Sequence, residues 1–380
     1  MSRTRYGVTR RTVLGTVGGA LVGLGAAGSA ASADEDRVRV NVGFASAAGR
    51  DAALSRADEV VYEFAFDAMT VLAAPGAVDA LATAPGIRYA EEDGTVRAIA
   101  QTLPYGVDRV DAEVAHANGE TGAGADVAII DTGIDADHPD LRANLGEGRA
   151  FLLGVESDLW DDDNGHGTHC AGIADAVDND EGVVGVGTEA TLHAVKVMTG
   201  AGIGTTSDVA RGIEYTADQG WDVGSLSLGG GESSLLRDAC EYAYGKGVLL
   251  VAAAGNDGPC TDCVGYPAAY PECVAVSATD ENDDLASYSS TGPEVELAAP
   301  GSNVYSTYVG GGYAELSGTS MACPHVAGAG GQLMANGYAN AEARDRLAAT
   351  AEDVGLTENE QGNGLLDVAA ALGLDSSDDL

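Results

Sequence analysis

The chain has 380 residues, 45% of them hydrophobic, which suffices for one large domain plus a smaller unit and argues against disorder of the whole chain. Asp and Glu number 59 against 19 Lys and Arg, and the net charge of −40 excludes nucleic acid as a partner class. Residues 101–380 hold 47 acidic and 9 basic side chains, and Lys196 and Lys246 are the two lysines, so we expect adaptation to molar salt, with an ordinary solubilising acidic surface as the alternative.

The first 33 residues predict a signal for export. Thr9-Arg10-Arg11-Thr12-Val13-Leu14 precedes a weakly apolar Gly/Ala run to Gly28, and Ala31-Ser32-Ala33 follows. This pattern resembles a twin-arginine secretion signal with an A-x-A cleavage site. The alternative, a membrane anchor, needs about 20 strongly apolar residues, more than this run supplies. We therefore expect a secreted, extracellular protein with no membrane anchor in its mature form.

Residues 34–100 are predicted to form a small α+β unit, and the pattern of apolar residues changes from Gln101 onward. The period-two stretch 37–42 predicts a strand, and 77–81 suggests a short helix. After Gln101, apolar strands at 126–130, 192–197 and 248–252 are interleaved with Gly-rich loops and helices. This alternation predicts an α/β domain over 101–380 with a mainly parallel central sheet covered by helices on both faces. Functional residues are then expected at the carboxyl ends of the strands.

Two motifs of the larger unit carry candidate chemistry. Asp131 ends the buried strand of Ile129-Ile130-Asp131-Thr132-Gly133, where a carboxylate is costly without a partner. An Asp that caps the next turn is the more common reading of such a motif. His166 lies in Asn164-Gly-His-Gly-Thr-His-Cys-Ala-Gly172, where a helix is expected to begin at His166. A metal site is a poorer reading, because no acidic residue completes an H-E-x-x-H spacing.

A third motif, Ser317-Gly-Thr-Ser-Met-Ala-Cys-Pro-His-Val-Ala-Gly328, places Ser320 at the start of an expected helix. There the helix dipole favours developing negative charge, and Pro324 is expected in the first turn, which has no internal N–H bonds to break. A capping serine before a packing helix explains this segment alone, but it leaves the Asp131 and His166 motifs unexplained.

Together the three motifs resemble the subtilisin-like serine proteases, in the chain order Asp, His, Ser. The resemblance spans roughly Gln101 to Ala370 and is closest to the halolysins, the haloarchaeal members. It implies a subtilisin-like fold in which Ser320 is the nucleophile, His166 the base and Asp131 the group that orients the imidazole. It also implies that residues 34–100 are an inhibitory and chaperoning propeptide, and that the substrates are proteins and peptides.

The resemblance extends to the residues around the substrate. In Ala252-Ala-Ala-Gly-Asn256, Asn256 matches the oxyanion-hole donor of the family. The segment Ser227, Leu228, Gly229 and Gly230 resembles the strand that pairs with the peptide backbone, and Gly265 resembles the floor of the primary pocket. Room above Gly265 implies broad specificity with a large apolar P1 residue.

Calcium is the cofactor that the resemblance implies, and no organic cofactor is expected. The oxygen ligands would come from Gln101, Asp140, Val177, Asn179, Glu181 and Val183. An all-oxygen cage of this kind suits a hard cation, although a plain acidic loop is the alternative. The match of Gln101 places the mature N-terminus near Ala100.

The six cysteines leave several possibilities open. Cys260 and Cys263 can form a local disulfide, with Cys273 as a competing partner, whereas a zinc site lacks four clear ligands. Cys323 stands where relatives usually carry Thr, Ser or Ala, and Cys170 follows the His166 motif. A cysteine nucleophile is disfavoured because Cys323 is about one helical turn deeper than Ser320.

Two other function classes compete with the protease. One is a catalytically inactive binding protein on the same fold, against which the intact Asp131, His166, Ser320 and Asn256 argue. The other is a lipase or esterase, but Gly-Thr-Ser-Met does not form a G-x-S-x-G elbow. We expect a monomer.

Overall fold

The computed structural model describes residues 37–93 and 101–376. The chain divides into two compact units, Met1–Arg97 and Ala98–Leu380. The predicted export signal, residues 1–33, lies outside the described residues. Across the described ranges no helix is both long and apolar enough to cross a membrane.

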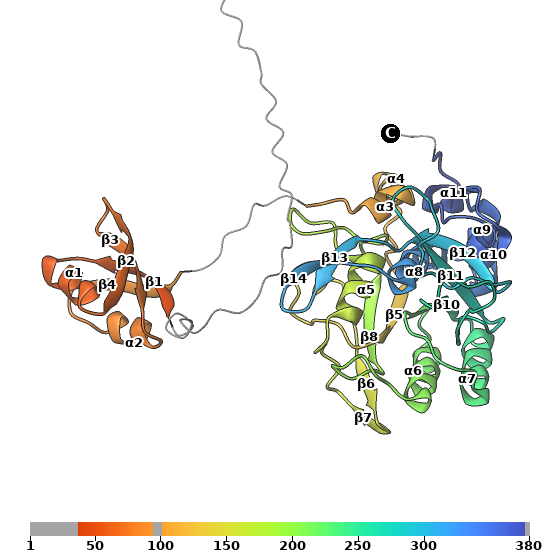
Figure 1. Cartoon of the computed structure of the whole chain (residues 1–380), viewed down its shortest axis with the longest axis horizontal. Helices are drawn as coiled ribbons and strands as arrows, with labels where there is room; N and C mark the ends of the chain where they lie inside the picture. The colour runs from red at the N-terminus through yellow and green to blue at the C-terminus, as the bar shows by residue number, and fades with distance from the viewer. Residues whose placement is uncertain (1–36, 94–100, 377–380) are drawn as a thin grey trace, which may run out of the picture. The chain divides into compact units, whose positions relative to one another are not determined.

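The first unit is a four-stranded antiparallel sheet with two short helices (Figure 1). Its elements are β1 (Val38–Phe44), α1 (Ala47–Leu54), β2 (Ala57–Phe64), β3 (Ala68–Ala73), α2 (Ala77–Ala82) and β4 (Ile87–Glu92), and the strand order is β2-β3-β1-β4. Val40, Val42, Met69 and Leu81 form a core that is fully buried. This is the α+β arrangement that the alternating pattern predicts.

The second unit is built on an eight-stranded sheet, β12-β11-β10-β9-β5-β8-β6-β7 (Figure 1). Every neighbouring pair is parallel except β6 and β7. The strands are β5 (Asp126–Asp131), β6 (Arg149–Leu152), β7 (Val155–Ser157), β8 (Thr191–Lys196), β9 (Val223–Leu226), β10 (Leu249–Ala253), β11 (Cys273–Thr279) and β12 (Val295–Pro300). The expected mainly parallel sheet is therefore present.

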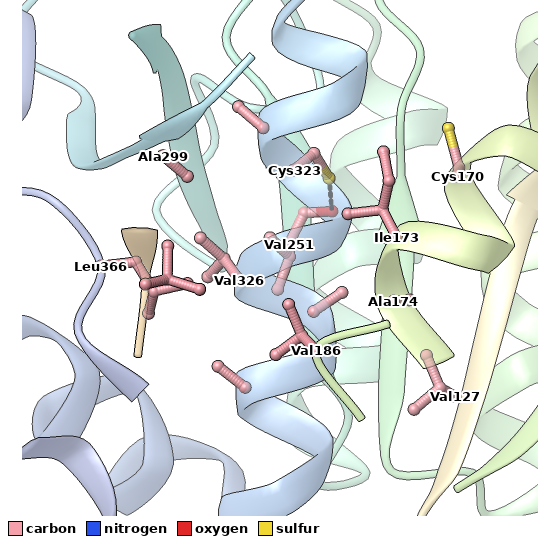
Figure 2. Close-up of a cluster of buried hydrophobic side chains, with 14 of the residues drawn as sticks. Val127, Cys170, Ile173, Ala174, Val186, Val251, Ala299, Cys323, Val326 and Leu366 are labelled. Carbon is pink, nitrogen blue, oxygen red and sulfur yellow. Dashed lines mark hydrogen bonds between the residues drawn. The ribbon is translucent and has the colours of Figure 1, made fainter. Parts of the chain in front are cut away.

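Helices cover both faces of this sheet, as expected. On one face α6 (Thr206–Gln219) and α7 (Ser234–Gly245) pack over a core that includes Ile130, Ile213 and Leu250. On the other face lie α5 (His166–Asp175) and α8 (Thr319–Ala335), and Figure 2 shows Ile173 and Ala174 of α5 on the side of α8 that carries Cys323.

Shorter elements complete the second unit. They are α3 (Tyr105–Arg109), α4 (Ala112–Ala117), β13 (Val304–Tyr308), β14 (Gly312–Leu316), α9 (Asn340–Thr350), α10 (Glu358–Gln361) and α11 (Val368–Leu372). The β13–β14 hairpin packs on α5, where His169 Nε2 hydrogen-bonds the carbonyls of Val304 and Ala314 at 3.1 and 3.0 Å. Burial lowers the pKa of His169 to about 4, so this second histidine of the motif is a neutral structural group.

Candidate active site

Asp131 and His166 are in direct contact at the carboxyl end of β5. His166 Nδ1 lies 2.8 Å from Asp131 Oδ1 and 3.0 Å from Oδ2. Asp131 is fully buried, whereas the His166 side chain is 28% exposed, so the carboxylate acts on one edge of a ring that substrate can reach. The negative charge of Asp131 raises the pKa of His166 above its ordinary value, and burial of the ring opposes this only in part.

The loop before α5 is held by a carboxylate that sequence reasoning missed. Asp162 Oδ1 accepts the backbone N–H groups of Asn164 and Gly165, and its Oδ2 accepts the N–H and hydroxyl of Thr168. Burial raises the pKa of Asp162, but these hydrogen bonds outweigh it and the net shift is downward. An ionised Asp162 therefore fixes the first turn of α5, from which His166 projects. In the sequence, the run Asp161-Asp162-Asp163 gives no sign of which of its carboxylates is buried.

Gly167 allows α5 to approach β5 this closely. A Cβ at position 167 would lie 2.2 Å from the Gly133 carbonyl oxygen and 3.1 Å from Asp131 Cβ. The Gly167 N–H also donates to Thr132 Oγ1 at 2.9 Å. The Asp131–His166 contact therefore depends on the missing side chain between them.

Ser320 is the second residue of α8, one position later than the sequence predicts, because the helix begins at Thr319. Its hydroxyl donates to the Ser227 carbonyl at 3.3 Å, and the Ser227 hydroxyl donates to the Ser320 carbonyl at 2.8 Å. Within the described residues, no hydrogen bond joins the Ser320 hydroxyl to His166. In unliganded active sites this bond often forms only when substrate binds.

The expectation that Pro324 lies in the first turn of α8 is wrong. Pro324 is the sixth residue of the helix, so its missing N–H leaves the carbonyl of Ser320 without its helical donor. The Ser227 hydroxyl and the Cys170 thiol, at 2.8 and 3.4 Å, replace that donor. Pro324 thus makes the backbone of Ser320 an attachment point for the neighbouring elements.

Asn256 follows β10 and lies beside Ser320. Its Oδ1 accepts the backbone N–H and hydroxyl of Thr319 at 2.9 and 3.1 Å. A Cβ built on Gly318 would lie 3.5 Å from Asn256 Nδ2 and 3.6 Å from the backbone nitrogen of Ser320. Because Thr319 holds the oxygen end of the amide, Nδ2 of the exposed Asn256 remains available as a donor, and both Nδ2 and the Ser320 N–H lie near Gly318.

Lys196 ties together the loops that carry Asp131 and His166. The side chain is 3% exposed and donates to the Thr132 carbonyl and, at 2.6 Å, to Asp163 Oδ1. Thr132 adjoins Asp131, and Asp163 precedes His166 by three residues. The feature of the sequence that could have drawn attention to Lys196 is that the chain has only two lysines.

A cavity of about 440 Å³ borders His166, and the whole of the expected substrate segment lines it. Ser227, Leu228, Gly229 and Gly230 line it. These residues follow β9 as a loop, and one antiparallel bridge joins Gly230 to Tyr266, so the expected strand is not part of the sheet.

Further apolar residues that sequence reasoning did not single out extend the cavity. They are Met198, Ile203, Val209, Leu236 and Tyr266. Gly265 is not one of the described residues that line it. Gly265 directly precedes Tyr266, which forms the bridge with Gly230. A Cβ built on Gly265 would lie 3.7 Å from the Ala254 carbonyl oxygen and 3.8 Å from that of Gly230.

The expected calcium ligands come together around Gln101. Gln101 Nε2 donates to the carbonyls of Val177 and Val183 at 2.8 and 3.2 Å. Asp140 Oδ2 accepts the Val183 N–H at 2.8 Å, and Asn179 Nδ2 lies 3.4 Å from Asp140 Oδ1.

These contacts fit a cation site. The side-chain NH₂ group of Gln101 lies between the carbonyl oxygens of Val177 and Val183. If the amide is turned by 180°, Oε1 takes the place of Nε2, and three oxygens then surround a position that suits a cation. Glu181 belongs to the same loop, and its N–H donates to Asn179 Oδ1 at 2.8 Å.

The structure decides part of the cysteine pairing. Cys260 and Cys263 are joined by a disulfide, and Cys273 lies instead next to Cys240. Cys170 and Cys323 are fully buried, and burial raises the pKa of both thiols, that of Cys323 to about 12. Figure 2 shows the Cys323 sulfur directed at the Val251 backbone, to whose carbonyl it donates at 3.4 Å. Neither thiol is placed as a nucleophile.

Comparison with known proteins identifies a family and several relatives of this chain. The model of the Subtilase family matches residues 122–364. The chain is 44% identical to an alkaline protease of Alkalihalobacillus alcalophilus over 82% of this chain and 81% of the relative. It is 41% identical to subtilisin E of Bacillus subtilis over 78% of each. It is 45% identical to subtilisin Savinase of Lederbergia lenta over 72% of this chain and 99% of the relative.

Proposed function

Because the chain belongs to the subtilase family and is a serine endopeptidase, we propose that it is a secreted, salt-adapted member of broad specificity that prefers a large apolar P1 residue. The observation that carries the catalytic part is the 2.8 Å contact of His166 with buried Asp131, beside a serine at a helix N-terminus. The alternative, an inactive binding protein on this fold, gives no reason to retain that contact.

In the proposed mechanism, Ser320 attacks the scissile carbonyl while His166 takes its proton. Asp131 fixes the imidazole tautomer, because Nδ1–H donates to the carboxylate and Nε2 is left to act as base. The oxyanion forms next to Asn256 Nδ2 and the Ser320 N–H, the latter free of helical bonding in the first turn. His166 then protonates the leaving amine, and water hydrolyses the acyl-enzyme by the reverse sequence of proton transfers.

Asn256→Ala is expected to lower kcat by about 10²–10³-fold with little change in KM, the size of effect known for the oxyanion asparagine of a subtilisin. The reason is that the amide is expected to strengthen its bond only as negative charge develops. Steady-state hydrolysis of a peptide nitroanilide measures both constants. Asn363→Ala, far from this site, is the matched control. An unchanged kcat in Asn256→Ala would remove Asn256 from the oxyanion hole.

The proposed P1 preference is supported by the apolar residues that line the cavity, among them Met198, Ile203 and Tyr266. We expect kcat/KM to be highest for Phe, Leu or Met at P1 in a peptide panel, with measurable cleavage after most other residues. Gly265→Val should shift the preference toward Ala, because a Cβ at position 265 would lie 3.8 Å from the carbonyl oxygen of Gly230, which lines the cavity. A strict requirement for Arg or Lys at P1 would overturn the proposal.

Export and salt adaptation are proposed from the N-terminal motif and the charge. The surface supports the proposed salt adaptation, because it is poor in lysine: Lys196 is buried, and Lys246 is the exposed lysine. Mutual repulsion of the acidic side chains is screened when the Debye length falls to about 3 Å at 1 M salt. Folding in a salt-rich cytoplasm would suit export of an already folded protein.

Calcium is proposed as a structural ion held by Gln101, Asp140, Asn179 and the carbonyls of Val177, Glu181 and Val183. When bound it would supply positive charge to a surrounding set of oxygens and stabilise the loop 177–183. The convergence of Gln101 Nε2 on two of these carbonyls supports this assignment.

A salt series with and without chelator tests both proposals on one sample. In dilute salt we expect activity and near-UV circular dichroism to fall together, and in molar salt EDTA should lower Tm. At a free calcium concentration 1,000-fold above Kd the lost stabilisation is about 4 kcal/mol. Asp140→Asn should remove the response to EDTA but keep the response to salt. Full structure and activity in dilute salt would contradict the salt adaptation alone.

The unit at residues 34–100 is proposed as an inhibitory propeptide. Strand β2 and the turn after it expose aromatic side chains, with Tyr62 57%, Phe64 38% and Phe66 64% exposed. An apolar patch of this kind on a small unit indicates a protein partner.

A further inference from the structure

Two buried thiols outside the active site face each other. Cys240 lies in α7 and Cys273 is the first residue of β11, and their sulfur atoms are 3.9 Å apart. The two residues are 0% and 2% exposed. The subtilase mechanism uses neither of them.

We propose that Cys240 and Cys273 form a second disulfide when the folded enzyme meets an oxidising environment. The sulfurs need to approach from 3.9 Å to about 2.05 Å, a shift of roughly 1 Å for each side chain. Two S–H bonds break and one S–S bond forms. The two electrons and two protons pass to a small-molecule disulfide, which is thereby reduced to two thiols.

The surroundings of Cys273 determine from which side an oxidant approaches and how the rate of the reaction depends on pH. Cys273 is one of the residues that line a cavity of about 490 Å³, together with Pro271, Glu294 and Arg344, so this cavity is the side from which a small-molecule disulfide would approach the thiol. The hydrogen bond with Cys240 and burial both raise the pKa of Cys273. Since the thiolate is the attacking species, closure should be slow near neutral pH and faster in alkali.

The bridge would join the two segments that flank the substrate cavity. The loop 227–231 continues into α7, and the loop that contains Gly265 and Tyr266 continues into β11. Tyr270 already connects them, because its hydroxyl accepts the Ser233 N–H at 2.9 Å and donates to the Ser233 carbonyl at 2.7 Å. The disulfide adds a covalent connection in the same layer.

Peptide mapping tests the bridge on the full chain carrying Ser320→Ala, which prevents self-digestion. The folded protein is incubated with oxidised glutathione, denatured, alkylated without reductant and cut with trypsin. We expect peptide 238–246, which contains Cys240, to be linked to peptide 247–344 and to be released by reductant. Alkylation of both Cys240 and Cys273 after this treatment would overturn the proposal. Because glutathione supplies the oxidant, the result does not depend on the proposed export or on activity.

Thermal unfolding separates a bridge from mere proximity. The matched background carries Cys260→Ala and Cys263→Ala, so that reductant acts on one disulfide. In it we expect oxidation to raise Tm by roughly 5–10 °C, because the bridge closes a loop of 33 residues in the unfolded chain. Adding Cys240→Ala should abolish the response to oxidant. A response that persists in that variant would also overturn the proposal.

Discussion

Ser320→Ala is expected to lower kcat for casein and peptide substrates by about 10⁶-fold, the loss known for the nucleophile of a subtilisin. The fold should survive, because the shorter of the two hydrogen bonds between this position and Ser227, at 2.8 Å, uses the backbone carbonyl of residue 320, and only the 3.3 Å bond of the hydroxyl is lost. If release of residues 34–100 is autocatalytic, the full chain should also stay uncut. Hydrolysis rates and intact mass measure the two effects.

The matched control is Ser287→Ala, which alters an exposed serine that does not line the cavity. A fluorophosphonate should label the wild-type chain at Ser320, whereas iodoacetamide should leave activity intact because Cys170 and Cys323 are buried. Substantial activity in Ser320→Ala would exclude this residue as nucleophile. A chain that lacks peptidase activity in wild type would instead favour the binding-protein alternative.

Asp131→Asn is expected to lower kcat by about 10⁴-fold, because the amide cannot hold the tautomer that leaves Nε2 as the base. The pH profile should also change. Protonated His166 cannot accept a proton, so kcat/KM falls as pH drops below the pKa of His166. Asp131 raises that pKa, and its removal should therefore move the acid limb of the profile to lower pH.

Asp175→Asn is the matched control for Asp131→Asn. Asp175 is fully buried like Asp131, but its carboxylate is bonded to Asn144 and the Ala190 N–H and not to His166. It can change stability, while the acid limb should stay where it is in the wild type. An acid limb that is equally unmoved in Asp131→Asn would contradict the role assigned to that carboxylate.

The parallel sheet and the Asp131–His166 contact could be predicted because strong local patterns encode them. Continuous apolar strands at 126–130 and 248–252 can be buried only between helices, and their carboxyl ends then gather Asp131 and Asn256 at one edge. The histidine and serine contexts are distinctive, and the helix starts at His166 and Thr319 fall within one residue of expectation.

What sequence reasoning missed depends on contacts between distant segments. Lys196 is 64 residues from Thr132 and 33 from Asp163, and no local pattern relates them. Asp162 was indistinguishable from its acidic neighbours until the fold buried it. The position of Pro324 was predicted wrongly for two reasons. The helix begins one residue earlier than expected, and Pro324 was assumed to lie in the first turn. Cys240 and Cys273 meet only once α7 packs against β11.

The close approach of α5 to β5 bears on when activity can first arise during folding. Gly167 and Gly172 each lower the intrinsic tendency to form a helix by about 1 kcal/mol relative to alanine. A ten-residue segment with two such positions has little helicity in isolation. The histidine therefore acquires its orientation only when the packed core imposes the helix around it. Proteolytic competence in this molecule is consequently a late property of folding, withheld from partly structured chains that would otherwise digest one another.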